Sequence, residues 1–112
     1  MARYHPRTEE EILAFKPRTA RQWELLPDGR VAILVPKFGG RLLGRWLQPR
    51  LRNPFFRIHL DDVGSFVWQH CDGARDGREI AEALQTRFPD LDKAQARFIL
   101  FLRQLWSQGH VG

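Results

Sequence analysis

The second half of the chain alternates short apolar patterns with clear stop signals. Residues 55–60 place Phe56, Ile58 and Leu60 on one side of an extended segment, the two-residue period of a strand with one face in the core. Three helical patterns follow, at residues 62–71, 76–88 and 92–108. Their ends are marked by Gly73, Pro89 and Gly109. One strand followed by three helices is the layout of a winged-helix domain.

The first half predicts the rest of a small sheet. Two extended segments, 22–26 and 30–35, flank Pro27-Asp28-Gly29, in which proline presets φ and glycine is free to take positive φ, so a hairpin is expected. Before it, Thr8 and Glu11 have the spacing of a capping box at the start of a short helix. The predicted fold is α+β and winged-helix-like, with a small three-stranded antiparallel sheet followed by a three-helix bundle.

Residues 36–54 form a basic insertion between the second and third strands. Arginine and lysine alternate there with leucine and tryptophan. One interpretation is a long connection whose apolar residues pack back onto the sheet. The other is a short basic amphipathic helix around 41–47 that docks on a membrane surface or an acidic partner. The candidate docking residues are Lys37, Arg41, Arg45 and Trp46.

The third helix carries more apolar side chains than one core stripe needs. The stripe consists of Ala94, Phe98, Ile99, Leu102, Leu105 and Trp106. Leu100 falls outside this stripe and shares a mixed face with Arg97, Phe101 and Gln104. This helix therefore either contacts something on two sides or exposes one leucine, which is ordinary for a protein surface.

Length and composition place the chain in one class. A chain of 112 residues with 43% apolar content is expected to form a single domain, with 1–20 as an N-terminal extension. The single cysteine, Cys71, excludes an internal disulfide and fits a reducing compartment. No window has the roughly 20 apolar residues of a membrane span or the start of a secretory signal. A cytoplasmic location is predicted.

The positive charge lies away from the helices. The net charge is +5, but residues 1–58 hold 12 basic and 5 acidic side chains, whereas residues 59–112 hold 6 and 8. A helix that reads DNA usually carries basic residues, because phosphate contacts supply much of the affinity. The near-neutral helices count against DNA, although residues 37–57 could grip phosphates as a basic wing. A DNA-binding winged helix is therefore the main alternative.

An enzyme is not expected. His70 and Cys71 are adjacent on a helix, about 100° apart, so they cannot easily share a proton. The histidines lack zinc spacing and cysteine partners, and the glycines lack the context of a phosphate-binding loop. Neither a cofactor nor a metal is predicted, and Cys71 is expected to be a small buried hydrophobe.

An ordered set of short motifs resembles the PqqD-like family, named after the pyrroloquinoline quinone biosynthesis protein D. The matching residues are Ile58 through Trp68, Cys71-Asp72-Gly73, Asp76 through Ile80 with Leu84, and Phe101 through Leu105 with Gly109-His110-Val111. They cover about half of the chain in the family's order and spacing. Two features depart from the family: Asp61 stands where asparagine is usual, and the 36–54 segment is longer and more basic than a simple turn.

The resemblance implies a peptide-recognition domain that holds the leader segment of a ribosomally made precursor peptide. Family members present that peptide to a modifying enzyme, commonly a radical S-adenosylmethionine maturase. The leader adds as a strand beside the third strand and lies against the third helix. By position, the implied peptide-binding residues are Phe55, Phe56, Arg57, Ile58, His59, Leu60, Arg97, Leu100, Phe101 and Gln104. A third alternative is a homodimer that buries Leu100, Phe101 and Trp46 at its contact.

Overall fold

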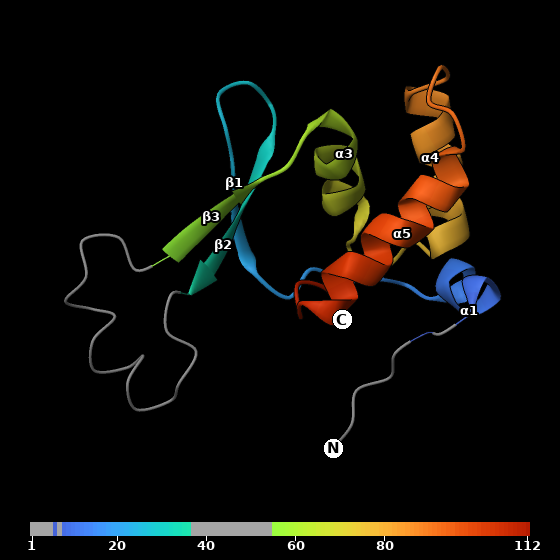
Figure 1. The fold of residues 1–112 in the computed structure, drawn as a ribbon, viewed down its shortest axis with the longest axis horizontal. Helices are drawn as coiled ribbons and strands as arrows, with labels where there is room; N and C mark the ends of the chain where they lie inside the picture. Colours follow the sequence, from blue (N-terminus) through green and yellow to red (C-terminus); the bar gives the residue numbers. More distant parts are fainter. Residues whose placement is uncertain (1–5, 7, 37–54) are drawn as a thin grey trace. The chain divides into compact units, whose positions relative to one another are not determined.

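The fold is α+β. The computed structural model describes residues 6, 8–36 and 55–112, and within them a three-stranded antiparallel sheet in the order β1-β2-β3 is followed by three helices (Figure 1). The elements are α1 (Glu9–Ala14), β1 (Gln22–Leu25), β2 (Val31–Pro36), β3 (Phe55–His59), α3 (Asp62–His70), α4 (Gly77–Arg87) and α5 (Ala94–Ser107).

The chain divides into two compact units, which are described separately. Residues 21–61 form the sheet unit, and residues 1–20 with 62–112 form the helical unit. That the two make a single domain stays a prediction. The basic insertion lies outside the described residues except for Pro36, and residues 1–7 do so except for Pro6.

The predicted hairpin is confirmed. β1 and β2 pair antiparallel from Gln22↔Leu34 to Leu25↔Val31. In the turn, the backbone N–H of Arg30 donates to Asp28 Oδ1 (2.9 Å), and Gly29 has a φ of 87°, which glycine adopts without a Cβ penalty. The Pro-Asp-Gly sequence therefore makes the turn that its chemistry predicts.

The two faces of the sheet differ in chemistry. Side chains alternate along each strand, and the register aligns them across the three strands. The apolar face consists of Trp23, Leu25, Val31, Ile33, Val35, Phe56, Ile58 and Leu60. The charged face holds Gln22, Glu24, Ala32, Leu34, Arg57 and His59.

The expectation that one side of the third strand lies in the core is wrong. Phe56 is 57% exposed and Ile58 is 36% exposed, and every residue from Phe56 to His59 is exposed. The buried side chains belong instead to Val31, Ala32 and Ile33 of β2, because the middle strand has a neighbour on each side. The sequence pattern gave the alternation correctly, but alternation alone does not distinguish a middle strand from an end strand.

Side-chain caps begin α1 and α4 as predicted. The backbone N–H of Glu11 donates to Thr8 Oγ1 (3.1 Å) at the start of α1. At the start of α4, the N–H of Glu79 donates to Asp76 Oδ1 (2.9 Å), and the N–H of Asp76 donates to Glu79 Oε1 (3.1 Å). This capping box satisfies two donors that the helix itself cannot use.

The third predicted helix begins two residues later than expected. α5 starts at Ala94 because Lys93 adopts a left-handed conformation with a φ of 54°, which interrupts the helical pattern. Its end is confirmed, with Gly109 at a φ of 75° just beyond Ser107. The predicted core stripe is also confirmed, since its six members are all buried: Ala94, Phe98, Ile99, Leu102, Leu105 and Trp106.

Residues 15–20, which we call the strap, tie the helical unit together. Backbone hydrogen bonds join the strap to residues 71–77 and 110–112. The N–H groups of Gly77 and Gly73 donate to the carbonyls of Phe15 and Pro17 (both 2.9 Å), and those of Thr19 and Ala20 donate to the carbonyls of Cys71 (3.2 Å) and His110 (2.8 Å). Arg18 and Gly112 exchange two such bonds, at 3.2 and 2.9 Å. Residues 15–20 of the predicted N-terminal extension are thus bonded to the rest of the helical unit.

Candidate functional site

Strand β3 is an edge strand of the sheet in the part of the chain that the structure describes. It pairs with β2 from Ala32↔His59 to Pro36↔Phe55, and just beyond it the N–H of Leu60 donates to the carbonyl of Val31 (2.9 Å). In an antiparallel ladder, opposed residues alternate between pairs that are hydrogen-bonded to each other and pairs that are not. Leu60 and Val31 form a hydrogen-bonded pair, so the next such pairs are Ile58 with Ile33 and Phe56 with Val35. Phe56 and Ile58 therefore turn their backbone groups toward β2, whereas Arg57 and His59 turn theirs toward the opposite edge.

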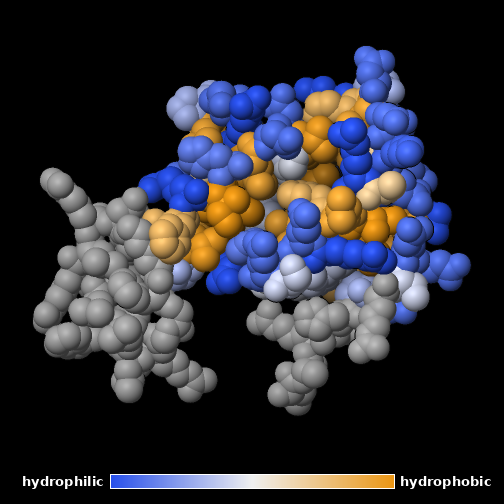
Figure 2. Space-filling view, viewed as in Figure 1, coloured by the Kyte–Doolittle hydropathy of each residue, from blue (hydrophilic) through white to orange (hydrophobic). Residues whose placement is uncertain are grey.

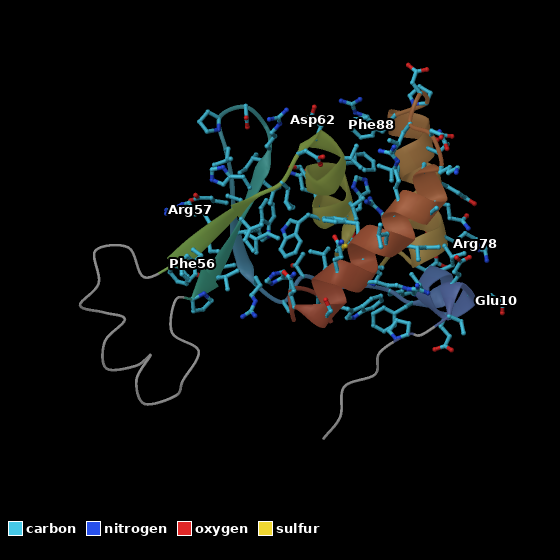
Figure 3. All side chains as sticks on the ribbon, viewed as in Figure 1. Glu10, Phe56, Arg57, Asp62, Arg78 and Phe88 are labelled. Atoms are coloured by element: carbon cyan, nitrogen blue, oxygen red, sulfur yellow. The ribbon has the colours of Figure 1, made fainter. Side chains whose placement is uncertain are left out.

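The side chains of β3 alternate in the other direction, between the two faces of the sheet. Phe56 and Ile58 lie on the apolar face, and apolar atoms reach the molecular surface over this strand in Figure 2. Arg57 and His59 lie on the charged face, and Figure 3 shows Phe56 and Arg57 leaving the strand on opposite sides. One edge thus presents backbone groups, apolar side chains and basic side chains in a fixed alternation.

An ion pair crosses the charged face. Arg57 Nε donates to Glu24 Oε1 at 2.8 Å, so it links β3 to β1 across β2. The two side chains are 43% and 40% exposed, so solvent screens the pair and we expect it to contribute less than about 1 kcal/mol. In the structure the pair places the guanidinium of Arg57 beside the carboxylate of Glu24 on the charged face.

The predicted residues of the third helix form one exposed surface of α5. Leu100 is 61% exposed, Arg97 and Gln104 are also exposed, and Phe101 is half-buried. Arg97, Leu100 and Gln104 therefore lie outside the helical core, whereas Phe101 is partly covered. The structure gathers residues 55–60 on one segment and these four on one helix face, and the two groups belong to different units.

The candidate docking residues Lys37, Arg41, Arg45 and Trp46 lie outside the described residues. By sequence position, these residues belong to the sheet unit. Residues 21–61 hold eight basic and three acidic side chains, a net charge of +5, whereas the rest of the chain holds ten of each. The net positive charge of the protein therefore belongs entirely to the sheet unit.

Sequence reasoning missed two parts of this surface. The exposed Trp23 (40%) and Leu25 (60%) of β1 continue the apolar face, and their alternation with Gln22 and Glu24 was readable in the sequence. The ion pair between Glu24 and Arg57 was not readable. It depends on the register of strands that the long 36–54 segment separates.

Cys71 behaves as the buried hydrophobe that the sequence predicted. It is 3% exposed, and its thiol donates to the carbonyl of Val67 (3.2 Å). Burial, reinforced by the carboxylate of Asp72, raises the pKa of this thiol from 9.0 to about 12. His70 engages a different group, because its Nδ1 lies 2.8 Å from the carbonyl of Phe66.

We therefore expect iodoacetamide to alkylate Cys71 at least about a hundredfold more slowly in the folded chain than in urea at neutral pH, because the thiolate is the reacting form. Mass spectrometry at timed intervals measures both rates. Because the folded pKa is raised, the stability that this thiol contributes is present below pH 9.0 and is lost as pH rises toward 12. Equal alkylation rates in the folded chain and in urea at neutral pH would contradict the burial of Cys71.

The described residues contain neither a membrane-spanning helix nor a cluster of metal ligands. None of the helices there has the length and apolarity to cross a bilayer. No three histidine, cysteine, aspartate or glutamate side chains in residues 6, 8–36 and 55–112 gather into a group that could hold a metal ion.

The fold and the surface define an α+β protein that presents an end strand and an exposed helix face. The family model of coenzyme PQQ synthesis protein D (PqqD) matches residues 57–111, so the resemblance is confirmed and the chain is PqqD-like over this range. The match includes most of β3 and all of α3, α4 and α5. No curated protein and no solved structure gives a significant match.

Proposed function

We propose that this protein is a cytoplasmic, non-catalytic chaperone that binds the leader segment of a ribosomal precursor peptide. It presents this peptide to a modifying enzyme, such as a radical S-adenosylmethionine maturase. The peptide adds as a strand beside β3, and the α5 residues Arg97, Leu100, Phe101 and Gln104 supply a second contact. The protein itself supplies no cofactor.

The end position of β3 is the observation that carries this proposal. An edge strand offers backbone donors and acceptors to an incoming chain, and the side chains beside it select alternate residues of that chain. β3 combines this position with the exposed apolar side chains of Phe56 and Ile58. The match to the PqqD family over residues 57–111 supports the same function independently of this geometry.

The candidate docking residues have a separate place in the proposal. Lys37, Arg41, Arg45 and Trp46 contact the partner enzyme rather than the peptide, because they belong to the segment that departs from the family pattern. Their basic charge suits an acidic surface on that enzyme.

A titration of the isotope-labelled full chain, followed residue by residue by NMR, tests the function. The ligand is the small peptide encoded nearest the gene, and a short DNA duplex at two salt concentrations is the control. We expect saturable shifts confined to β3, Leu60 and the exposed face of α5, with none from DNA. Salt-sensitive shifts along residues 37–57 caused by DNA alone would overturn the proposal and make this a nucleic-acid-binding protein.

Replacing Leu100 with serine separates the α5 contact from folding. Because Leu100 is 61% exposed, we expect the free energy of unfolding to change by no more than about 0.5 kcal/mol. The affinity for the peptide should fall about tenfold, since covering a leucine contributes about 1.5 kcal/mol or more. Isothermal titration calorimetry and urea unfolding measure the two effects.

Leu102 is the contrasting position on the same helix. It is fully buried, so Leu102→Ala should lower the free energy of unfolding by about 2–5 kcal/mol. If Leu100→Ser leaves the peptide affinity unchanged, the α5 face has no part in peptide binding.

A further inference from the structure

The apolar face of the sheet consists of rows that run across the strands. In one row, Trp23 of β1 pairs with Ile33 of β2, which pairs with Ile58 of β3. Ile33 at the centre is fully buried, whereas Trp23 and Ile58 at the two ends are 40% and 36% exposed. An added strand extends such a row by one residue. Because directly opposed apolar side chains stabilise strand pairing, the added residue should be apolar.

The rows alone do not say which edge of the sheet takes the strand. Both β1 and β3 are end strands among the described residues, and both expose apolar side chains at their edges. The two edge strands differ at the positions between these apolar residues. On the charged face, β1 presents Gln22 and Glu24, whereas β3 presents Arg57 and His59.

A strand with carboxylates at alternate positions is therefore suited to β3 and repelled by β1. Beside β3, its carboxylates lie next to Arg57 and His59 while its apolar residues lie next to Phe56 and Ile58. Beside β1, the same carboxylates would lie next to Glu24. The net charge of +5 on residues 21–61 attracts the same class of peptide over a longer range.

Glu24 also affects how tightly an acidic peptide binds beside β3. Its Oε1 lies 2.8 Å from Arg57 Nε, so the protein already supplies a carboxylate to the guanidinium that a peptide carboxylate would use. Both side chains are partly exposed, so an incoming carboxylate can compete for this position. Such a built-in competitor weakens acidic peptides selectively.

We infer that β3 selects a peptide segment in which apolar residues alternate with carboxylates, and that Glu24 competes with those carboxylates for Arg57. This inference rests on the proposed strand addition and specifies the peptide class that it takes. It involves residues of the sheet unit alone.

Three synthetic peptides of about seven residues, the length of a typical strand, test the pattern. In the first, leucine alternates with glutamate; in the second, leucine alternates with glutamine; the third has the composition of the first with its leucines adjacent. We expect the first to bind the full chain most tightly by fluorescence anisotropy and the third to bind about tenfold more weakly. Equal affinities for the first and third would overturn the alternation.

Two variants test the competition. Glu24→Gln should strengthen binding of the glutamate peptide about two- to fivefold, and Arg57→Gln should weaken it by a similar factor, the range of exposed ion pairs. The glutamine peptide should respond to neither variant. In the double variant the effect of Glu24→Gln should vanish, because its target is gone. A Glu24→Gln effect that persists without Arg57, or that is equal for both peptides, would overturn the competition.

These outcomes are distinct from a failure of the proposed function. If the precursor peptide shifts β3 while the synthetic series shows no preference for alternation or charge, strand addition stands and the inferred peptide class is wrong. If neither the precursor peptide nor any synthetic peptide perturbs β3, both the proposed function and this inference are wrong.

Discussion

Replacing Gly77 with alanine should lower the free energy of unfolding by about 2–3 kcal/mol, the cost of overpacking a site that cannot move. Gly77 is the first residue of α4, and its N–H donates to Phe15 of the strap (2.9 Å). A Cβ at this position would overlap the carbonyl oxygen of Ile12 and lie 3.0 Å from the Cα of Leu13. Both obstacles are backbone atoms of α1, so the clash is relieved only if α1 moves away. Urea unfolding measures the loss.

Gly29 provides the matched control. No atom lies within 4 Å of the Cβ that an alanine would add there, but its φ is 87°. Gly29→Ala should therefore cost only about 1–2 kcal/mol of backbone strain and leave α1 in place. Amide exchange separates the two variants, because Gly77→Ala should expose the amides of α1 to exchange whereas Gly29→Ala should not. Unchanged protection of Ile12 and Leu13 in Gly77→Ala would show that the close approach is absent.

Replacing His59 with proline should reduce peptide affinity at least about tenfold while the sheet survives. The backbone N–H of His59 points to the edge opposite β2, and proline at this position removes that donor and places its ring in the path of an added strand. We expect the free energy of unfolding to fall by only about 1 kcal/mol, because no bond to β2 is lost. Calorimetric titration with the precursor peptide gives the affinity.

Ile58→Pro is the neighbouring control with the opposite result. The N–H of Ile58 points toward β2, so proline there removes a bond of the ladder and should cost about 2–3 kcal/mol of stability. Loss of peptide binding in Ile58→Pro therefore reports a damaged sheet, whereas loss in His59→Pro reports a blocked edge. If His59→Pro binds the peptide with unchanged affinity, strand addition at β3 is refuted.

Local patterns were sufficient to predict most of the elements. The Pro-Asp-Gly turn, the Asp76–Glu79 capping box and the buried stripe of α5 each depend on residues close together in the chain, and the structure confirms each of them. The start of α5 was wrong because a single left-handed residue, Lys93, interrupts a pattern that otherwise begins earlier. Hydrophobic periodicity carries no information about such a backbone reversal.

The candidate site was predictable only in part, because its properties depend on which strands are neighbours. The alternation of residues 55–60 was correct, but its meaning changed from a core face to an exposed face once β3 was found at the end of the sheet. The ion pair between Glu24 and Arg57 required the register of two strands that are not neighbours in the sheet. Whether a peptide binds these residues stays a prediction.

The pairing of the strap with residues 110–112 has a consequence for how the protein is made. The sheet unit lies within residues 21–61, so all of its strands leave the ribosome while most of the helical unit is still missing. The helical unit can form its bonds from Arg18 to Gly112 only about 50 residues later, which takes several seconds at about 5–20 residues per second. During that interval the newly made β3 edge is exposed on chains that have not finished folding, and such an edge is where nascent chains can pair with one another.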